Sequence, residues 1–173
     1  MTDDSWRTFI PKHINHESPL EHVVVSVVLI CSRAIQQELT RHRLASYSIE
    51  STRWIDYFKK QGGTVDFIQP SDWADFTQEQ RDAYLEAMLS SEKHYNNLRA
   101  LGLPAQRARD AFALGLKGEI YMTANVRQWR HIFRERHINQ AAHKDIRQLT
   151  GMISEELLAR APVFFQDVYD PKG

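Results

Sequence analysis

The sequence VVVSVVLIC, which runs from Val23 to Cys31, is the longest apolar stretch of the chain and decides its fold. Its β-branched and nearly continuous apolar character predicts a β-strand that is buried on both faces. Ser32 follows and can cap a helix over residues 33–40, which ends at the sequence RHR of residues 41–43. We therefore expect a rigid strand and helix to hold this polar sequence.

The RHR sequence places two guanidinium groups, Arg41 and Arg43, on either side of the imidazole of His42. Ser51 stands after seven further residues, and Arg53 follows closely. Guanidinium and hydroxyl groups donate hydrogen bonds to phosphates, so this cluster predicts an anion site. A solvated basic turn would use the same residues, because cations at the end of a helix complement its dipole.

Composition limits the class of protein. A chain of 173 residues, 42% of them hydrophobic and 25% charged, is long enough to form a real core, so we expect residues 1–173 to make a single domain. Lys and Arg together number 22, as do Asp and Glu, so the net charge is zero. Without a basic excess, a general grip on nucleic acid is disfavoured.

The single cysteine, Cys31, cannot form an internal disulfide, and within an apolar run it is more often a core residue than a nucleophile. Residues 23–31 are too few to span a bilayer and no leader pattern precedes them, so we expect no membrane contact. The reducing cytoplasm, or the host cytoplasm for a viral chain, fits these features. His13, His16 and His22 lack the spacing of zinc ligands, so we expect no metal.

Periodicity and turn residues predict the remaining elements. The expected strands cover residues 64–68 and 118–123, and the expected helices cover residues 78–101, 126–136 and 139–160, with a short helix after Pro104. Thr77 and Asn125 are expected to cap two of these helices, and Gly102 is expected to stop the first. Residues 1–20 are polar and are expected to be irregular.

The sequence RHRLASYSIESTRW of residues 41–54 resembles the signature of the flavin-dependent thymidylate synthases, the ThyX family. Three further elements of that family occur here in its order and at its intervals. They are HESPLEH at residues 16–22, Ala-Arg at residues 108–109 and Asn-Val-Arg at residues 125–127. The resemblance covers roughly residues 16–150.

This resemblance implies an α+β fold with a mixed or antiparallel sheet and long helices, assembled as a homotetramer whose active sites are shared between subunits. It also implies an enzyme that converts dUMP to dTMP with methylenetetrahydrofolate as one-carbon donor, FAD as cofactor and NADPH as reductant. In such an enzyme the cofactor carries the redox step, so no GxGxxG sequence is required, and none occurs.

The resemblance also assigns site residues. Those expected to bind FAD are His22, Arg41, His42, Arg43, Asn125, Arg127 and His131. Those expected to bind dUMP are Glu38, Arg41, Ser51, Arg53, Arg109 and Arg136. Arg136 is the expected catalytic residue, because it would stabilise the enolate-like charge that develops as C5 of uracil attacks the one-carbon unit. Ser51 is expected to donate a hydrogen bond rather than to act as a nucleophile, since no base accompanies it.

Helical spacing within residues 126–136 separates two groups of polar side chains. Arg136 falls on the side that carries the apolar residues, whereas Arg127 and His131 fall near the other side. A pocket of one subunit rarely uses opposite sides of one helix. If both sides bind ligands, we therefore expect the sites to be shared between subunits.

Some residues depart from those common in the family, namely Glu38, Trp54, Ala113 and His131. They leave open a relative that binds flavin and nucleotide but has lost the synthase activity. A second alternative is a nucleic-acid-binding module in which Trp54 and Trp129 stack on bases. The zero net charge disfavours it, because such binding depends on a basic surface.

Overall fold

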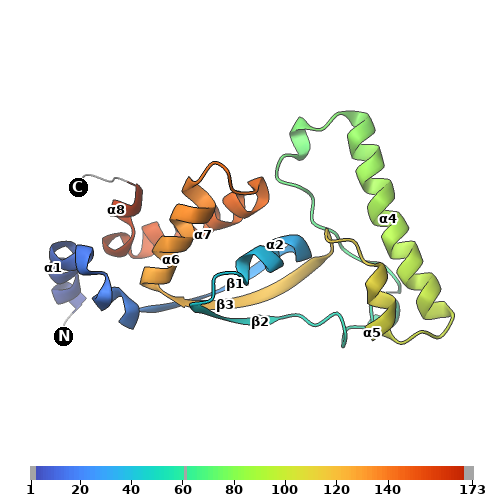
Figure 1. Cartoon of the computed structure of the whole chain (residues 1–173), viewed down its shortest axis with the longest axis horizontal. Coiled ribbons are helices and arrows are strands. Elements are labelled where there is room, and N and C mark those ends of the chain that lie inside the picture. Colours follow the sequence, from blue (N-terminus) through green and yellow to red (C-terminus); the bar gives the residue numbers. More distant parts are fainter. Residues whose placement is uncertain (1–2, 61, 170–173) are drawn as a thin grey trace. The chain divides into compact units, whose positions relative to one another are not determined.

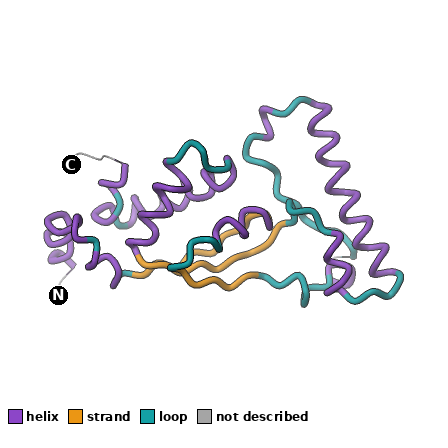
Figure 2. Tube along the Cα trace, viewed as in Figure 1, coloured by secondary structure: helices purple, strands orange, loops and turns teal. Residues whose placement is uncertain are grey.

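A computed structural model of the chain describes residues 3–60 and 62–169. The chain divides into two compact units that alternate along the sequence. Unit 1 comprises Met1–Val28, Glu38–Tyr47 and Tyr121–Gly173, and unit 2 comprises Leu29–Gln37 and Ser48–Ile120. Figure 1 labels the elements, and Figure 2 separates helices, strands and loops by colour.

A sheet of three strands has the order β1-β3-β2. The strands are β1 (Val24–Ser32), β2 (Ala45–Ile49) and β3 (Lys117–Asn125). Each strand begins in one unit and ends in the other, so the two units share their strands. A small sheet combined with mostly helical connections confirms the predicted α+β class.

Strand β1 confirms the predicted position but not the predicted burial on both faces. Leu29 and Cys31 are buried, whereas the alternate residues Val24, Val28 and Ile30 are 59%, 51% and 55% exposed. This alternation is typical of a strand that is covered on one face only. Burial raises the pKa of the Cys31 thiol to about 11, so Cys31 stays a protonated core residue.

The helices of unit 1 are α1 (Asp3–His13), α6 (Val126–Phe133), α7 (Lys144–Arg160) and α8 (Gln166–Tyr169). The expectation of an irregular start was wrong, because α1 is helical and buries Ile10. The Asn125 side chain accepts a hydrogen bond from the Gln128 amide at 2.9 Å, which confirms the predicted cap of α6. Helix α7 begins at Lys144, five residues later than expected, and the His143 side chain caps it.

Aromatic rings form the core of unit 1. Trp129 and Phe133 of α6 are fully buried, and their ring centroids lie 5.9 Å apart. Phe165 is buried and packs on Phe133, with ring centroids 5.7 Å apart. The Trp129 indole also donates to the Val25 carbonyl oxygen at 3.2 Å, so α6 is fixed to strand β1.

The helices of unit 2 include α3 (Tyr57–Lys60), α4 (Gln78–Ala100) and α5 (Ala105–Ala108), while α2 (Arg33–Leu39) begins in unit 2 and ends in unit 1. The predicted caps are confirmed. Ser32 accepts from the Ile35 amide at 3.4 Å, and Thr77 and Gln80 form both bonds of a capping box. Gly102 adopts φ +89° directly after α4, a conformation that suits glycine.

Residues 64–68 do not form the predicted strand. Phe67 makes a single antiparallel bridge to Leu116, and the Val65 amide donates to the Glu92 carboxylate at 2.7 Å instead of to a strand. The sheet's remaining strand, β2, was not among the strands predicted from the sequence. Within residues 3–60 and 62–169, no helix has the length and apolar character needed to cross a membrane.

Candidate active site

The backbone of the RHR sequence is fixed within unit 1 by Tyr47. Its hydroxyl oxygen lies 2.7 Å from the Leu39 carbonyl oxygen and 2.8 Å from the His42 carbonyl oxygen. Burial raises the pKa of Tyr47 to about 12, so the hydroxyl keeps its proton and remains a donor. The end of α2 and the start of β2 are thereby joined at the RHR sequence, which confirms that a rigid element holds it.

His42 is the buried member of this sequence, with 7% of its surface exposed. Its Nε2 atom accepts a hydrogen bond from Arg136 Nε at 3.1 Å. Burial, together with the charges of Arg136 and His131, lowers the pKa of His42 to about 4. His42 is therefore neutral near pH 7, and its ring proton lies on Nδ1 because Nε2 acts as the acceptor.

Arg136 is held at two of its three nitrogens. Nε donates to His42, and Nη1 lies 3.2 Å from Glu38 Oε2 in an ion pair. Among the described residues, Nη2 has no hydrogen-bond partner. Arg41, His42, His131 and Arg136 line a cavity of about 350 Å³, here called the small cavity. The guanidinium is thus fixed in orientation and keeps one free nitrogen.

The expectation that Arg136 and His131 lie on opposite sides of one helix was wrong. Both line the small cavity. After Phe133 the chain forms a π-helical turn, Arg134–Ile138, in which the Asn139 amide donates to the Arg134 carbonyl oxygen five residues earlier. Residues five apart point about 140° away from each other in an α-helix, but the wider π-helical turn brings them nearer the same side.

A second, larger cavity of about 930 Å³, here called the large cavity, lies beside those parts of strands β2 and β3 that belong to unit 1. Arg43, Asn125, Arg127 and His131 all line it, and all four were expected to bind flavin. His131 lines both cavities, and its ring meets the His42 ring edge-on with centroids 5.9 Å apart. The two cavities therefore share a wall.

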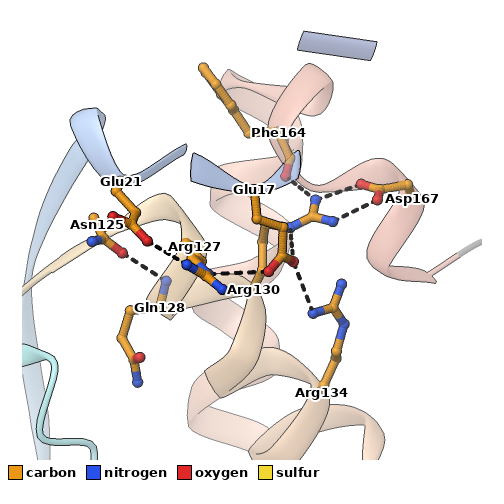
Figure 3. A network of polar contacts seen from close by, with 9 residues as sticks. All are labelled: Glu17, Glu21, Asn125, Arg127, Gln128, Arg130, Arg134, Phe164 and Asp167. Carbon is orange, nitrogen blue, oxygen red and sulfur yellow. Dashed lines mark hydrogen bonds and ion pairs between the residues drawn. The ribbon is translucent and has the colours of Figure 1, made fainter. Parts of the chain in front are cut away.

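One wall of the large cavity is a network of ion pairs (Figure 3). Glu17 lies 3.2 Å from Arg127, 3.9 Å from Arg130 and 3.6 Å from Arg134. Arg127 also pairs with Glu21. Glu17 and Glu21 were assigned no binding role from the sequence. Arg127, Arg130 and Arg134 are three and four residues apart, so they lie on one face of the helix. This spacing was the signal in the sequence that could have indicated the network.

The buried end of this network is Arg130, which is 2% exposed. Its Nη1 and Nη2 atoms each donate to the Asp167 carboxylate at 2.6 Å, and Nη1 also donates to the Phe164 carbonyl oxygen at 2.7 Å. Burial alone would raise the pKa of Asp167, but the hydrogen bonds and charge of Arg130 hold that pKa below its ordinary value. This bidentate pair connects α6 to α8.

The other expected nucleotide contacts, Ser51, Arg53 and Arg109, belong to unit 2. Arg109 Nη1 donates to the Thr52 hydroxyl at 3.3 Å, so Arg109 and the loop that follows β2 come together within this unit. The Arg53 guanidinium lies 4.9 Å from the ring centroid of Trp54, which is 76% exposed. The nucleotide contacts of these residues remain predictions.

His22 ends a short turn, Ser18–His22, and its side chain is exposed. Within the described part of the chain it lines neither cavity, so its contact with flavin also remains a prediction. The same part of the chain contains no group of three His, Cys, Asp or Glu side chains that could hold a metal ion.

The family model described as thymidylate synthase complementing protein matches residues 2–163. The chain belongs to this family. Among its relatives are the probable flavin-dependent thymidylate synthases of Mycobacterium phage L5 and Mycobacterium phage D29. The L5 protein is 30% identical over 172 residues, which cover 91% of this chain and 67% of the relative. The D29 protein is 28% identical over 167 residues, which cover 90% of this chain and 68% of the relative.

The flavin-dependent thymidylate synthase of Pyrococcus abyssi is 27% identical over 163 residues, which cover 92% of this chain and 66% of the relative. This member of the thymidylate synthase complementing protein family thus spans about two thirds of the length of the curated relatives it matches. The matches cover most of the chain, including the RHR sequence and α6.

The residues of the large cavity suit a flavin dinucleotide. A volume of about 930 Å³ lies at the upper end of the range for ligand sites, as a large cofactor requires. Asn125 uses its oxygen to cap α6, so its amide nitrogen remains a donor on the cavity wall. Arg127 keeps Nη2 without a partner among the described residues. These donors fit the carbonyl oxygens and ring nitrogens of such a cofactor.

Proposed function

We propose that this chain is a flavin-dependent thymidylate synthase that converts dUMP to dTMP. In the proposed reaction methylenetetrahydrofolate supplies the one-carbon unit and NADPH is the reductant. Bound FAD would supply the redox chemistry, which the side chains of the protein do not provide. The protein's own residues would bind, orient and stabilise charge.

The observation that carries this proposal is that two cavities of different size, about 350 and about 930 Å³, lie next to each other. His131 lines both of them. The RHR sequence contributes to both, because Arg41 and His42 line the small cavity and Arg43 lines the large one. We assign dUMP to the small cavity and FAD to the large one. A flavin and a pyrimidine in adjacent cavities would be close enough to react.

Arg136 would act on the pyrimidine through electrostatics. Its free Nη2 can donate to a ring carbonyl, while His42 and Glu38 hold the other nitrogens. As C5 attacks the one-carbon unit, negative charge develops on the carbonyl edge, and a guanidinium fixed in advance stabilises it without reorganising. No protein nucleophile is needed, and the buried Cys31, with its pKa raised to about 11, is not suited to be one.

We also propose that the phosphate and sugar of dUMP contact Ser51, Arg53 and Arg109, and that the chain assembles with copies of itself as a homotetramer. What supports self-association is the apolar row Val24, Val28 and Ile30, which is more than half exposed on β1. A Val28→Lys substitution should shift the assembly toward smaller species in multi-angle light scattering. An unchanged mass would contradict this interface.

A second candidate function is a flavin-binding relative that consumes NADPH without making dTMP. The specific observation in its favour is the ion pair between Glu38 and Arg136. A carboxylate beside the guanidinium offsets part of the positive charge that the pyrimidine would meet, which weakens stabilisation of the transition state. If the negative charge of Glu38 limits the reaction by offsetting the charge of Arg136, the Glu38→Gln variant should form dTMP faster than the wild type.

The deciding experiment measures NADPH oxidation by the purified protein with FAD, in the presence and absence of dUMP and methylenetetrahydrofolate, followed by chromatography for dTMP. We expect dTMP only when both substrates are present. NADPH consumption without dTMP would favour the second candidate, and absence of flavin binding would contradict both.

Arg136→Ala is the matching variant. It should keep FAD binding, because Arg136 does not line the large cavity, and should lose dTMP formation. Arg160→Ala serves as the control, since this arginine is 76% exposed and, among the described residues, pairs with Glu156 alone, on the same helix. Full activity in Arg136→Ala would remove Arg136 from the mechanism.

A further inference from the structure

Both cavities contain one arginine that is held in the same way. Arg136 has Nε on His42 and Nη1 on Glu38, and Arg127 has Nε on Glu17 at 3.2 Å and Nη1 on Glu21. In each case Nη2 has no partner among the described residues. Two anchors fix the plane of a guanidinium, so the third nitrogen points in a defined direction.

We propose that Glu17 is a positioning residue for the cofactor, acting through Arg127. This inference rests on the proposed function, because it assigns FAD to the large cavity. Glu17 itself would not need to touch the cofactor. It would hold Arg127 so that Nη2 is presented to a ligand acceptor at the cavity wall.

The backbone at Glu17 supports a role for the side chain. Glu17 has φ +48°. Within residues 3–60 and 62–169, it is the one residue other than glycine with a positive φ. A glutamate in this left-handed region is strained, whereas Gly, Asn and Asp adopt it more readily. The chain thus holds a long carboxylate at a position where shorter residues would be less strained.

The arginines around Glu17 explain why its length matters. The carboxylate reaches Arg127 at the cavity and also approaches the buried Arg130, whose Nε lacks a hydrogen bond. Arg134 completes the set at 3.6 Å. Glu17 therefore connects the cavity arginine to the Arg130–Asp167 pair, which joins α6 to α8 (Figure 3). Arg127 is in this way attached to the core of unit 1.

The charges also indicate which ligand group Arg127 suits. Glu17, Glu21 and Asp167 carry three negative charges, and Arg127, Arg130 and Arg134 carry three positive charges, so the network is neutral. A neutral network attracts a phosphate weakly. Nη2 of Arg127 is instead suited to an uncharged acceptor, such as a ring carbonyl or ring nitrogen of the flavin or adenine.

The test is the affinity for FAD, measured by flavin fluorescence on the full chain. Glu17→Gln removes the charge with almost no change of size, and we expect the Kd for FAD to rise about fivefold to tenfold. Glu156→Gln makes the same chemical change at an exposed ion pair of α7 and should leave the Kd unchanged. An unchanged Kd in Glu17→Gln would overturn the inference.

A double-mutant cycle separates positioning from general stabilisation. In an Arg127→Met background, Glu17→Gln should have no further effect on the Kd, because the group through which it acts is gone. A full additional effect in that background would overturn the inference. The melting temperature of the apo protein is recorded for each variant, since a structural role would lower it without depending on Arg127.

Glu17→Asp and Glu17→Asn form a second pair, chosen because both residues tolerate φ +48° and should fold. Both are shorter than glutamate by one methylene group and should not reach Arg127, so both should raise the Kd for FAD, and a wild-type Kd in either variant would overturn the inference. If the wild-type chain binds no FAD, the proposed function fails and this inference fails with it. If the wild type binds FAD and forms dTMP, these variants test the role of Glu17 alone.

Discussion

Replacing His42 by glutamine should reduce the dependence of folding stability on pH. His42 is buried and its pKa falls from 6.5 to about 4 in the folded chain. A folded-state pKa below the unfolded value means that the unfolded chain binds the proton more tightly. Stability is therefore full above pH 6.5, is lost as the pH falls below that value, and stops falling below about pH 4.

The size of the effect follows from the two pKa values. Between pH 7 and pH 5 the proton linkage of His42 alone removes about 2 kcal/mol from the free energy of unfolding. His42→Gln cannot titrate, but its amide oxygen can still accept from Arg136 Nε. The variant should therefore lose about 2 kcal/mol less than the wild type over the same interval.

The assay is urea unfolding at pH 7 and pH 5, followed by tryptophan fluorescence at one protein concentration. The chain has seven further histidines, and because both proteins contain them, their titration cancels in the comparison. His131, Arg136 and Glu135 are the charged or titratable neighbours that set the His42 pKa. If wild type and variant lose the same stability between pH 7 and pH 5, His42 is not a neutral buried base and the account of the small cavity is wrong.

Three further substitutions probe other parts of the chain. Ser51→Ala should raise the KM for dUMP while leaving measurable turnover, and loss of all chemistry with intact dUMP binding would make Ser51 a nucleophile after all. Asp167→Asn should cost about 2–3 kcal/mol in urea unfolding, because it leaves the buried Arg130 without its carboxylate, and a loss below about 1 kcal/mol would contradict this. Thr77→Ala should cost about 1 kcal/mol and speed hydrogen exchange at the start of α4, with FAD affinity unchanged.

The features that the sequence predicted correctly are local ones. Ser32, Thr77 and Asn125 each cap a helix through a hydrogen bond to a residue three positions later, so the short segment alone determines the contact. The binding roles of the RHR sequence and of the residues of α6 came from the resemblance to a family and remain predictions, although most of these residues line the two cavities. These assignments required no knowledge of distant contacts.

The features that were missed depend on distant partners. Strand β2 pairs with β3, which lies about seventy residues later in the chain, and no pattern within Ala45–Ile49 announces that pairing. The Val65 amide donates to the Glu92 carboxylate of α4 and not to a neighbouring strand. The local sequence around Val65 does not indicate this contact either. From the sequence alone, Glu17 is an ordinary polar residue. The fold places it beside three arginines of α6 and of the turn that follows α6.

The π-helical turn changes the argument about shared active sites. The expectation of sites shared between subunits rested on opposite helix sides, but His131 and Arg136 line the same cavity in one chain. Arg136, which we propose to be catalytic, thus meets both His42 and Glu38 within one chain. Any sharing between subunits must then arise from the residues of unit 2 that are expected to hold dUMP, or from the exposed row of β1. A tetramer would complete substrate binding, whereas the orientation of Arg136 is already determined within the chain.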